Sequence, residues 1–232
     1  ETVVRKILSR VEGAYEVRVE HDVQVPIGAG YGASGAGALA VGLALNEALG
    51  LRLTYNEVGK IAHVAEVECK TGLGTVAPLM LGGAVLTVKS GGPGFCLIDR
   101  IPLKPNYRIV SGYFGPIATK TVLASPRVMG RVNRFGRRTL NQILEDPSIE
   151  NFMACCKKFA AEVGLMSSRV RRLIDAMEKA GAVGATQNMV GEAAHALVDE
   201  ERVEKVVEAV GRLMPSEKIY IAKIDLAGAR LI

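Results

Sequence analysis

The chain has few of the residues that cross-link, stack or bind metals. Its 232 residues include no tryptophan, 5% aromatic residues, three histidines and four cysteines. The cysteines show no CxxC spacing, and no two histidines lie two to five residues apart, which argues against a disulfide framework and against a zinc site. We expect all four to be buried as small hydrophobic side chains; they are Cys69, Cys96, Cys155 and Cys156.

Long apolar runs are also absent. No run reaches the roughly 18 residues that a membrane span needs. The opening ETVVRKILSR lacks the apolar centre and the small-residue cleavage site of a signal peptide. With 49% apolar and 23% charged residues, we predict a soluble, cytoplasmic globular chain without a membrane partner.

The chain is basic, with a net charge of +5, which favours an anionic ligand. Its densest basic run has spacings of three and four that place several arginines on one helical face. Only Phe135 interrupts the run, whereas a nucleic-acid stacking platform needs several aromatic residues. We therefore expect a solvated helix face and no nucleic-acid partner. The arginines are Arg127, Arg131, Arg134, Arg137 and Arg138.

The order of predicted elements indicates an α+β chain. Hydrophobic periodicity and capping signals predict helices over residues 2–12 (closed by Gly13), 34–49, 54–68, 125–144, 148–163, 167–179 and 200–213. Alternating or short apolar runs predict strands over residues 15–25, 82–90, 95–101, 107–114 and 218–225, with a further edge at 228–232. Strands followed by helices and a closing strand favour two subdomains, residues 1–115 and 116–232.

The stretch VPIGAGYGASGAGALA, residues 25–40, is rich in glycine and alanine directly before a predicted helix. Small residues let the backbone wrap a ligand with its N–H groups turned inward. The helix start adds unpaired N–H groups and the positive end of its dipole. Tight helix packing alone would need fewer glycines, so we favour a phosphate site. No Lys-Ser/Thr pair follows, as in a P-loop, and no acidic strand end lies about 20 residues on, as in a dinucleotide fold.

Five stretches resemble those of one enzyme family. Residues 26–36 fit the pattern P-x-x-x-G-[LY]-G-[SA]-S-[SG]-A, which resembles the central phosphate-binding motif of the GHMP small-molecule kinases. HVAEVECKTGLGTVAPLMLGG (63–83) is similar to the family's acidic helix and TGLG loop. ATQNMVGEAAHAL (185–197) is similar to the third family loop as it occurs in archaeal pantoate kinases, and GPIATKTVL (115–123) and KIDLAGARLI (223–232) also resemble that subfamily.

This resemblance covers nearly the whole chain. It implies a two-subdomain GHMP kinase-like fold, with a ribosomal S5 domain 2-like N-terminal part and a helical, ferredoxin-like C-terminal part. It also implies ATP and Mg²⁺ as cofactors, phosphorylation of the 4-hydroxyl of pantoate on the archaeal route to coenzyme A, and a homodimer. The chain starts inside a predicted helix at Glu1, so we expect the family's first strand segment to be missing.

The resemblance also implies roles for particular residues. Ser34, Glu66 and Thr75 are the implied catalytic residues, and Ser34 and Glu66 the implied Mg²⁺ ligands. Ser34 can in addition cap the helix. Glu66 and Glu68 lie two residues apart and point in different directions on a helix, so we expect one to be solvated. The implied phosphate-binding residues are Gly28, Ala29, Gly30, Tyr31, Gly32, Ala33, Ser34, Gly35, Ala36 and Gly37.

Thr75 stands where many relatives have an aspartate. Threonine cannot take up a proton near neutral pH, so we expect it to orient the acceptor hydroxyl and not to act as a general base. His63, Thr119, Lys120 and Gln187 are the implied substrate contacts. The alternative for His63 is a purely structural role. Thr119 and Lys120 could instead simply begin a helix. The loop 184–191 could instead be a buried turn between helices. Two other functions are alternatives to pantoate phosphorylation. One is a GHMP kinase with a different alcohol acceptor, and the other is a nucleotide-binding protein with a decayed catalytic site.

Overall fold

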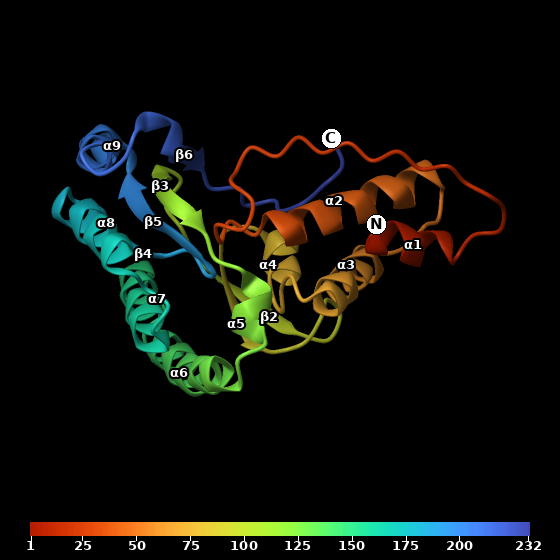
Figure 1. Ribbon diagram of the computed structural model, residues 1–232, viewed down its shortest axis with the longest axis horizontal. Helices are drawn as coiled ribbons and strands as arrows, with labels where there is room; N and C mark the ends of the chain where they lie inside the picture. The colour runs from red at the N-terminus through yellow and green to blue at the C-terminus, as the bar shows by residue number, and fades with distance from the viewer. The chain divides into compact units, whose positions relative to one another are not determined.

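The computed structural model describes all 232 residues, and Figure 1 shows a chain of helices and strands, which confirms the α+β prediction. Contacts divide it into two compact units. The first comprises Glu1–Pro26, Gly32–Arg100 and Asp225–Ile232, and the second Ile27–Tyr31 and Ile101–Ile224. The chain therefore changes unit at both ends of Ile27–Tyr31, again between Arg100 and Ile101, and once more between Ile224 and Asp225. The family subdomain boundary itself stays a prediction.

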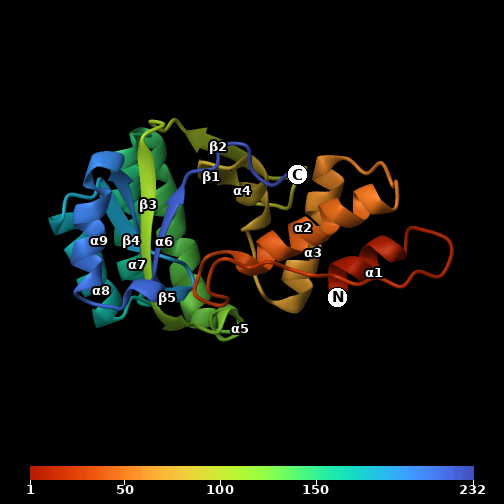
Figure 2. The ribbon, with the colours of Figure 1, turned by 90° about the horizontal axis from the view of Figure 1, so that it is seen from above.

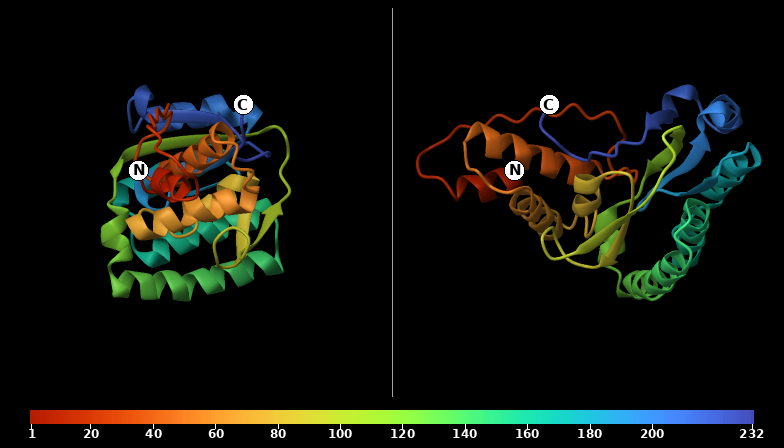
Figure 3. Two further views of the ribbon diagram at one scale, coloured as in Figure 1. Left: turned by 90° about the vertical axis from the view of Figure 1, so that its right-hand side faces the viewer. Right: turned by 180° about the vertical axis from the view of Figure 1, so that it is seen from behind.

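The first unit has three packed helices, a short helix and a two-stranded sheet. Its elements are α1 (Thr2–Leu8), α2 (Ala33–Ala48), α3 (Tyr55–Cys69), α4 (Val76–Leu81), β1 (Ala84–Lys89) and β2 (Leu97–Ile101). Figures 1 and 3 show α1, α2 and α3 side by side. Ile7, Leu45 and Ile61 meet in the cluster between them. The predicted capping box starts α3, because Thr54 N–H donates to Glu57 Oε2 at 2.7 Å and Glu57 N–H returns to Thr54 Oγ1 at 3.3 Å.

Two predictions in this unit are wrong. Helix α1 ends at Leu8, so Gly13 does not cap it. Residues 15–25 form no strand and make no backbone hydrogen bond, and Tyr15, Val19 and Val23 are exposed. Alternation describes which side chains one face would bury, but a strand also needs a partner backbone, and no segment of this chain pairs with residues 15–25.

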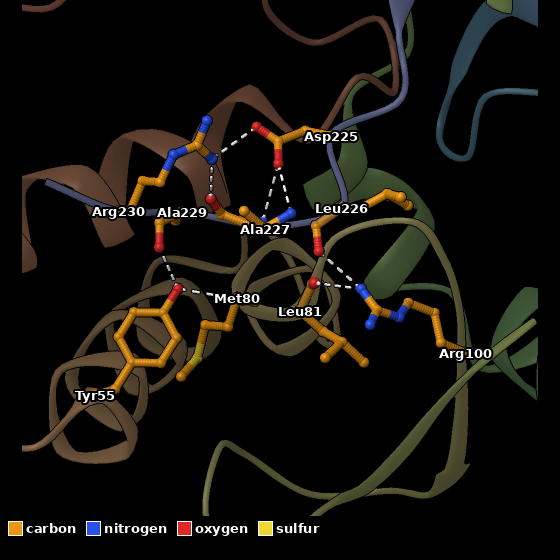
Figure 4. A network of polar contacts seen from close by, with 10 residues as sticks. Tyr55, Met80, Leu81, Arg100, Asp225, Leu226, Ala227, Ala229 and Arg230 are labelled. Carbon is orange, nitrogen blue, oxygen red and sulfur yellow. Dashed lines mark hydrogen bonds and ion pairs between the residues drawn. The ribbon is translucent and has the colours of Figure 1, made fainter. Parts of the chain in front are cut away.

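The C-terminal tail also forms no strand, contrary to the expected edge at 228–232, and side chains hold it instead (Figure 4). Asp225 Oδ1 accepts from the N–H groups of Ala227 and Gly228 at 2.7 and 3.1 Å. Arg100 donates to Leu226 O at 2.7 Å. Gly228 has φ +70°, and a Cβ there would lie 2.1 Å from Met80 O. The tail therefore depends on a glycine at this close approach.

The second unit is a four-stranded antiparallel sheet in the order β4-β5-β3-β6 with helices against it. Its elements are β3 (Tyr107–Pro116), α5 (Thr119–Leu123), α6 (Pro126–Glu145), α7 (Ile149–Val163), α8 (Ser168–Lys179), β4 (Gly184–Gln187), β5 (Gly191–Asp199), α9 (Val203–Gly211) and β6 (Ile219–Lys223). Figure 2 shows α8 and α9 along the sheet. Leu173 of α8 and Val206 of α9 pack on Val110 and Ala196 of the sheet in one buried cluster.

The stretch 184–191, expected as a turn between helices, is mostly strand. Gly184–Gln187 form β4, Gly191 begins β5, and only residues 188–190 connect them. All four residues of β4 are buried, and a strand buried on both faces has no polar alternation to reveal it.

The composition-based predictions have mixed outcomes. All five arginines of the basic run lie exposed on α6, as expected. No cysteine is paired. Cys155 is buried, Cys96 and Cys156 are half-buried, and Cys69 is exposed, so the burial prediction is confirmed for Cys155 and wrong for Cys69. None of the helices combines the length and apolar character that a membrane crossing requires.

Candidate functional site

The first half of the glycine loop lies in the second unit. Gly28 and Gly30 have φ of +77° and +83°, a left-handed conformation that glycine adopts without strain. A Cβ at Gly30 would lie 2.7 Å from Asn188 O, so only glycine allows this close approach. Gly28 O accepts from Ile117 N–H at 3.1 Å. Ile117 lies just before Thr119 and Lys120, which begin α5 as a half-buried and an exposed residue.

The second half of the loop starts α2 in the first unit. The N-cap is Gly32, with φ +74° and no side-chain capping bond. Ser34 therefore does not cap the helix, contrary to expectation. The first backbone hydrogen bond of the helix is donated by Ala36 N–H to Gly32 O. The N–H groups of Ala33, Ser34 and Gly35 therefore have no partner and are available to an anion.

Glu66 of α3 lies beside this helix start and is only 4% exposed. Its Oε1 accepts hydrogen bonds from the hydroxyls of Ser34 and Thr71, the latter at 2.6 Å. It forms no ion pair, whereas Glu68 is exposed and pairs with Lys6 at 2.7 Å. The two glutamates thus point apart, as predicted. A buried carboxylate without a cationic partner is costly, so this oxygen cluster is suited to a cation.

The donor set fits Mg²⁺. This ion is usually held by one or two carboxylates together with phosphate oxygens and water. Glu66 and the Ser34 hydroxyl supply hard oxygen donors. No group of three or more His, Cys, Asp or Glu side chains gathers here or anywhere else in the chain, so phosphate oxygens and water would have to complete the coordination. A Cβ on Gly72 would lie 2.4 Å from Glu66 Oε2, so the TGLG loop can close over the carboxylate only with glycine there. Sequence reasoning missed Thr71, whose only signal is its place at the end of the acidic helix.

Thr75 joins this group. It is the N-cap residue of α4. Its Cβ lies so close to Gly35 that a Cβ added to Gly35 would be 3.3 Å from it. The structure therefore brings together Ser34, Glu66 and Thr75, the three residues predicted to be catalytic. His63 lies one turn before Glu66 on α3, half-buried, with its ring against Gly92 in the turn after β1.

Tyr31 ties the loop to the sheet of the second unit. Its hydroxyl lies 2.7 Å from Ser111 Oγ on β3. Ser111 Oγ donates its own proton to Ala194 O at 2.7 Å, so Tyr31 is the donor to Ser111. Burial raises the pKa of the Tyr31 phenol, which keeps it protonated for this role. Sequence reasoning placed Tyr31 in the loop but did not find its anchor.

The hairpin between β4 and β5 carries the predicted Gln187. Its side chain is 2% exposed, and its Nε2 donates to Gly191 O at 2.9 Å and Leu165 O at 3.3 Å. Its amide hydrogens are therefore engaged by main-chain carbonyls, and only Oε1 has no partner. Asn188 differs, because its Oδ1 lies 2.7 Å from His195 Nδ1 and its Nδ2 makes no hydrogen bond within the protein. Burial lowers the pKa of His195 to about 4.

Comparison with known families matches residues 2–83 to the GHMP kinases N terminal domain and residues 140–216 to the GHMP kinases C terminal domain. The chain is similar to the pantoate kinase of Methanocaldococcus jannaschii, with 34% identity over 180 residues, 77% of this chain and 64% of the relative. It is 32% identical to the pantoate kinase of Thermococcus kodakarensis over 190 residues, 82% of this chain and 62% of the relative.

Solved structures agree in fold. One described as a phosphotransferase related to the CoA biosynthesis pathway has a TM-score of 0.78 at 29% identity, covering 88% of this chain and 65% of that one. A homoserine kinase from Cytophaga hutchinsonii, at 18% identity, has a TM-score of 0.64 and covers 89% of this chain and 69% of its own, a likeness of fold alone. The chain spans less than two thirds of the length of the pantoate kinases that it matches. It belongs to the GHMP kinase family.

Proposed function

We propose that the full-length protein transfers a phosphoryl group from ATP to a small alcohol, and that the acceptor is the 4-hydroxyl of pantoate. The observation that carries the phosphoryl-transfer part is the buried Glu66 carboxylate, bonded to hydroxyls beside a helix start with free N–H groups. Similarity to pantoate kinases from two archaeal species supports the choice of acceptor.

In this proposal the chain mainly positions groups and neutralises charge, as phosphoryl transfer requires. The N–H groups at the start of α2 bind phosphate oxygens. Ser34 and Glu66 would hold Mg²⁺, which when bound offsets the charge on the phosphates. Thr75 orients the acceptor hydroxyl and cannot remove its proton. Forgoing a general base costs about 10²–10⁴-fold in rate at most, so a slow kinase remains compatible with threonine.

The test is ADP production by the full-length protein with ATP, Mg²⁺ and pantoate. Mevalonate and homoserine serve as matched acceptors, because relatives include a mevalonate kinase from Thermococcus gammatolerans and a homoserine kinase. We expect turnover with pantoate well above both. Turnover with another acceptor alone would contradict the acceptor proposal and leave the kinase proposal in place.

Thr75 favours one second candidate, a nucleotide-binding protein whose catalytic site has decayed. That candidate predicts tight ATP binding without turnover of any acceptor. It also predicts that Thr75→Asp gains activity, because a carboxylate at the start of α4 restores a proton acceptor next to Gly35. If wild-type protein turns over and Thr75→Asp is slower, the decayed-site candidate is excluded.

A further inference from the structure

The two oxygens of the Glu66 carboxylate have different surroundings, all within the first unit. Oε1 accepts hydrogen bonds from the hydroxyls of Ser34 and Thr71, the latter at 2.6 Å. Oε2 accepts none. A Cβ built on Gly72 would overlap Oε2, and one built on Gly35 would lie 3.2 Å from it. The carboxylate is therefore bound on one oxygen and bordered by two glycines on the other.

Oε2 is open even though Glu66 as a whole is only 4% exposed. Gln187 Oε1 is the only fully buried side-chain polar atom without a hydrogen-bond partner. Glu66 Oε2 has no partner either, so it must reach the surface of the protein. Each carboxylate oxygen offers about two lone-pair sites. Hydroxyl groups use those of Oε1, whereas those of Oε2 are free.

Thr71 lies in the turn that follows α3. Lys70 has φ +56°, and the chain turns back there, so that Thr71 N–H donates to Glu66 O at 3.0 Å. The Thr71 hydroxyl lies 2.6 Å from Glu66 Oε1 and 3.3 Å from Glu66 O. A hydroxyl has a single proton to donate, and the shorter contact with the charged oxygen takes it. The main chain of Thr71 thus closes the helix end, and its side chain holds the carboxylate.

Two hydroxyls from separate segments fix the orientation of the carboxylate. Ser34 donates from α2 and Thr71 from the turn after α3, so together they oppose rotation of the carboxylate. Without Thr71, Oε1 would regain an acceptor site and the group could turn. A carboxylate held as it is here presents one oxygen, Oε2, to a cation.

We propose that Thr71 is the positioning residue that makes Glu66 a monodentate ligand through Oε2, and that this arrangement selects Mg²⁺ over Ca²⁺. The inference rests on the proposed function, because it takes the metal to bind together with ATP. Mg²⁺ demands near-octahedral geometry and keeps several waters, whereas Ca²⁺ takes more oxygens and often a bidentate carboxylate. Groups that hydrogen-bond a metal ligand typically contribute about 10–100-fold in metal affinity.

Three variants separate positioning from helix stability. Thr71→Val replaces the hydroxyl by a methyl group of similar size and keeps the main-chain bond to Glu66 O. Thr71→Ser keeps the hydroxyl. Thr54→Val is the matched control, because the Thr54 hydroxyl caps the start of the same helix and does not contact Glu66. If Thr71 only closed the end of α3, the two valine variants would behave alike.

The measurement is the Kd of a non-hydrolysable ATP analogue on the full-length protein, in EDTA and in saturating Mg²⁺, with thermal unfolding to confirm that each variant folds. The Kd in EDTA divided by the Kd in Mg²⁺ reports how tightly the complex holds the metal, independently of catalysis. We expect this ratio to fall about ten-fold or more in Thr71→Val. It should stay within about three-fold of wild type in Thr71→Ser and Thr54→Val, as should the Kd in EDTA for every variant.

Ca²⁺ in place of Mg²⁺ gives a second arm. Thr71→Val frees Oε1 for a bidentate contact, which Ca²⁺ readily accepts and Mg²⁺ disfavours, so the loss with Ca²⁺ should be several-fold smaller. An unchanged Mg²⁺ ratio in Thr71→Val, an equal loss in Thr71→Ser or Thr54→Val, or equal losses with the two ions each overturns the inference.

The wild-type titration distinguishes failure of the inference from failure of the proposed function. Wild-type protein that binds no analogue overturns the proposed function itself. Wild-type protein that binds the analogue equally well in EDTA and in Mg²⁺ overturns the inference and leaves nucleotide binding in place.

Discussion

Removing the charge of Glu66 should make the ligand-free protein more stable. Glu66 is buried, forms no ion pair, and accepts two hydroxyl hydrogen bonds on one oxygen. Glu66→Gln keeps a carbonyl oxygen for Ser34 and Thr71 and places an NH₂ of similar size against Gly72. The substitution therefore changes the charge and leaves the shape nearly unchanged.

The expected gain follows from two opposing effects. A buried ion costs several kcal/mol in effective desolvation. Hydrogen bonds to a charged acceptor contribute about 1.5–3 kcal/mol each, against about 0.5–1.5 kcal/mol for neutral pairs, so the two hydroxyl bonds weaken by about 2–3 kcal/mol together. The net gain is about 1–2 kcal/mol, or about 2–8 °C in Tm for a chain of this size.

The assay is thermal unfolding of the full-length protein in EDTA and again with saturating ATP and Mg²⁺. Without ligand Glu66→Gln should melt higher than wild type. With ligand the order should reverse, because only wild type gains the full stabilisation of a bound cation and nucleotide. Glu68→Gln on the same helix is the control, since its exposed pair with Lys6 contributes at most about 1 kcal/mol. A lower Tm for Glu66→Gln in EDTA would refute the claim that this carboxylate lacks its cation.

Three further predictions concern the rest of the chain. Tyr31→Phe removes the donor to Ser111 and should lower the free energy of unfolding by about 0.5–1.5 kcal/mol in urea; no change would mean that the anchor contributes nothing. Gly228→Ala should lower it by at least about 2 kcal/mol, because of its positive φ and the overlap with Met80 O, and a neutral result would show that the tail is not held there. His195 has its pKa lowered to about 4, so the unfolded chain takes up its proton first as pH falls from about 6.5. The stability present above pH 6.5 should be lost towards pH 4, and His195→Asn should show a smaller loss over that interval; parallel curves would contradict the shift.

Local signals in the sequence predicted most helices to within a few residues. Ser125, Ser148 and Ser167 are the N-caps of α6, α7 and α8, each accepting from a backbone N–H three residues on. Such caps depend only on neighbouring residues. The alternation of residues 15–25 is equally local, but a strand needs partners elsewhere in sequence, and this segment has none in the chain.

The candidate site was predicted in part. The family pattern placed Ser34, Glu66 and Thr75 in one group, and the structure brings them together. It did not reveal Thr71, whose hydroxyl donates to Glu66 from the loop after α3. It also did not reveal His195, whose hydrogen bond with Asn188 depends on the pairing of β4 with β5. The contact of His195 with Asn188 follows from strand register, which a single sequence does not define when both faces are buried.

The most direct test of the account is a crystal structure of the full-length protein with a non-hydrolysable ATP analogue and Mg²⁺. The account predicts phosphate oxygens within about 2.7–3.2 Å of the backbone N–H groups of Ala33, Ser34 and Gly35, and the metal on Glu66. A triphosphate bound elsewhere, or a helix start filled by the protein's own side chains, would contradict it.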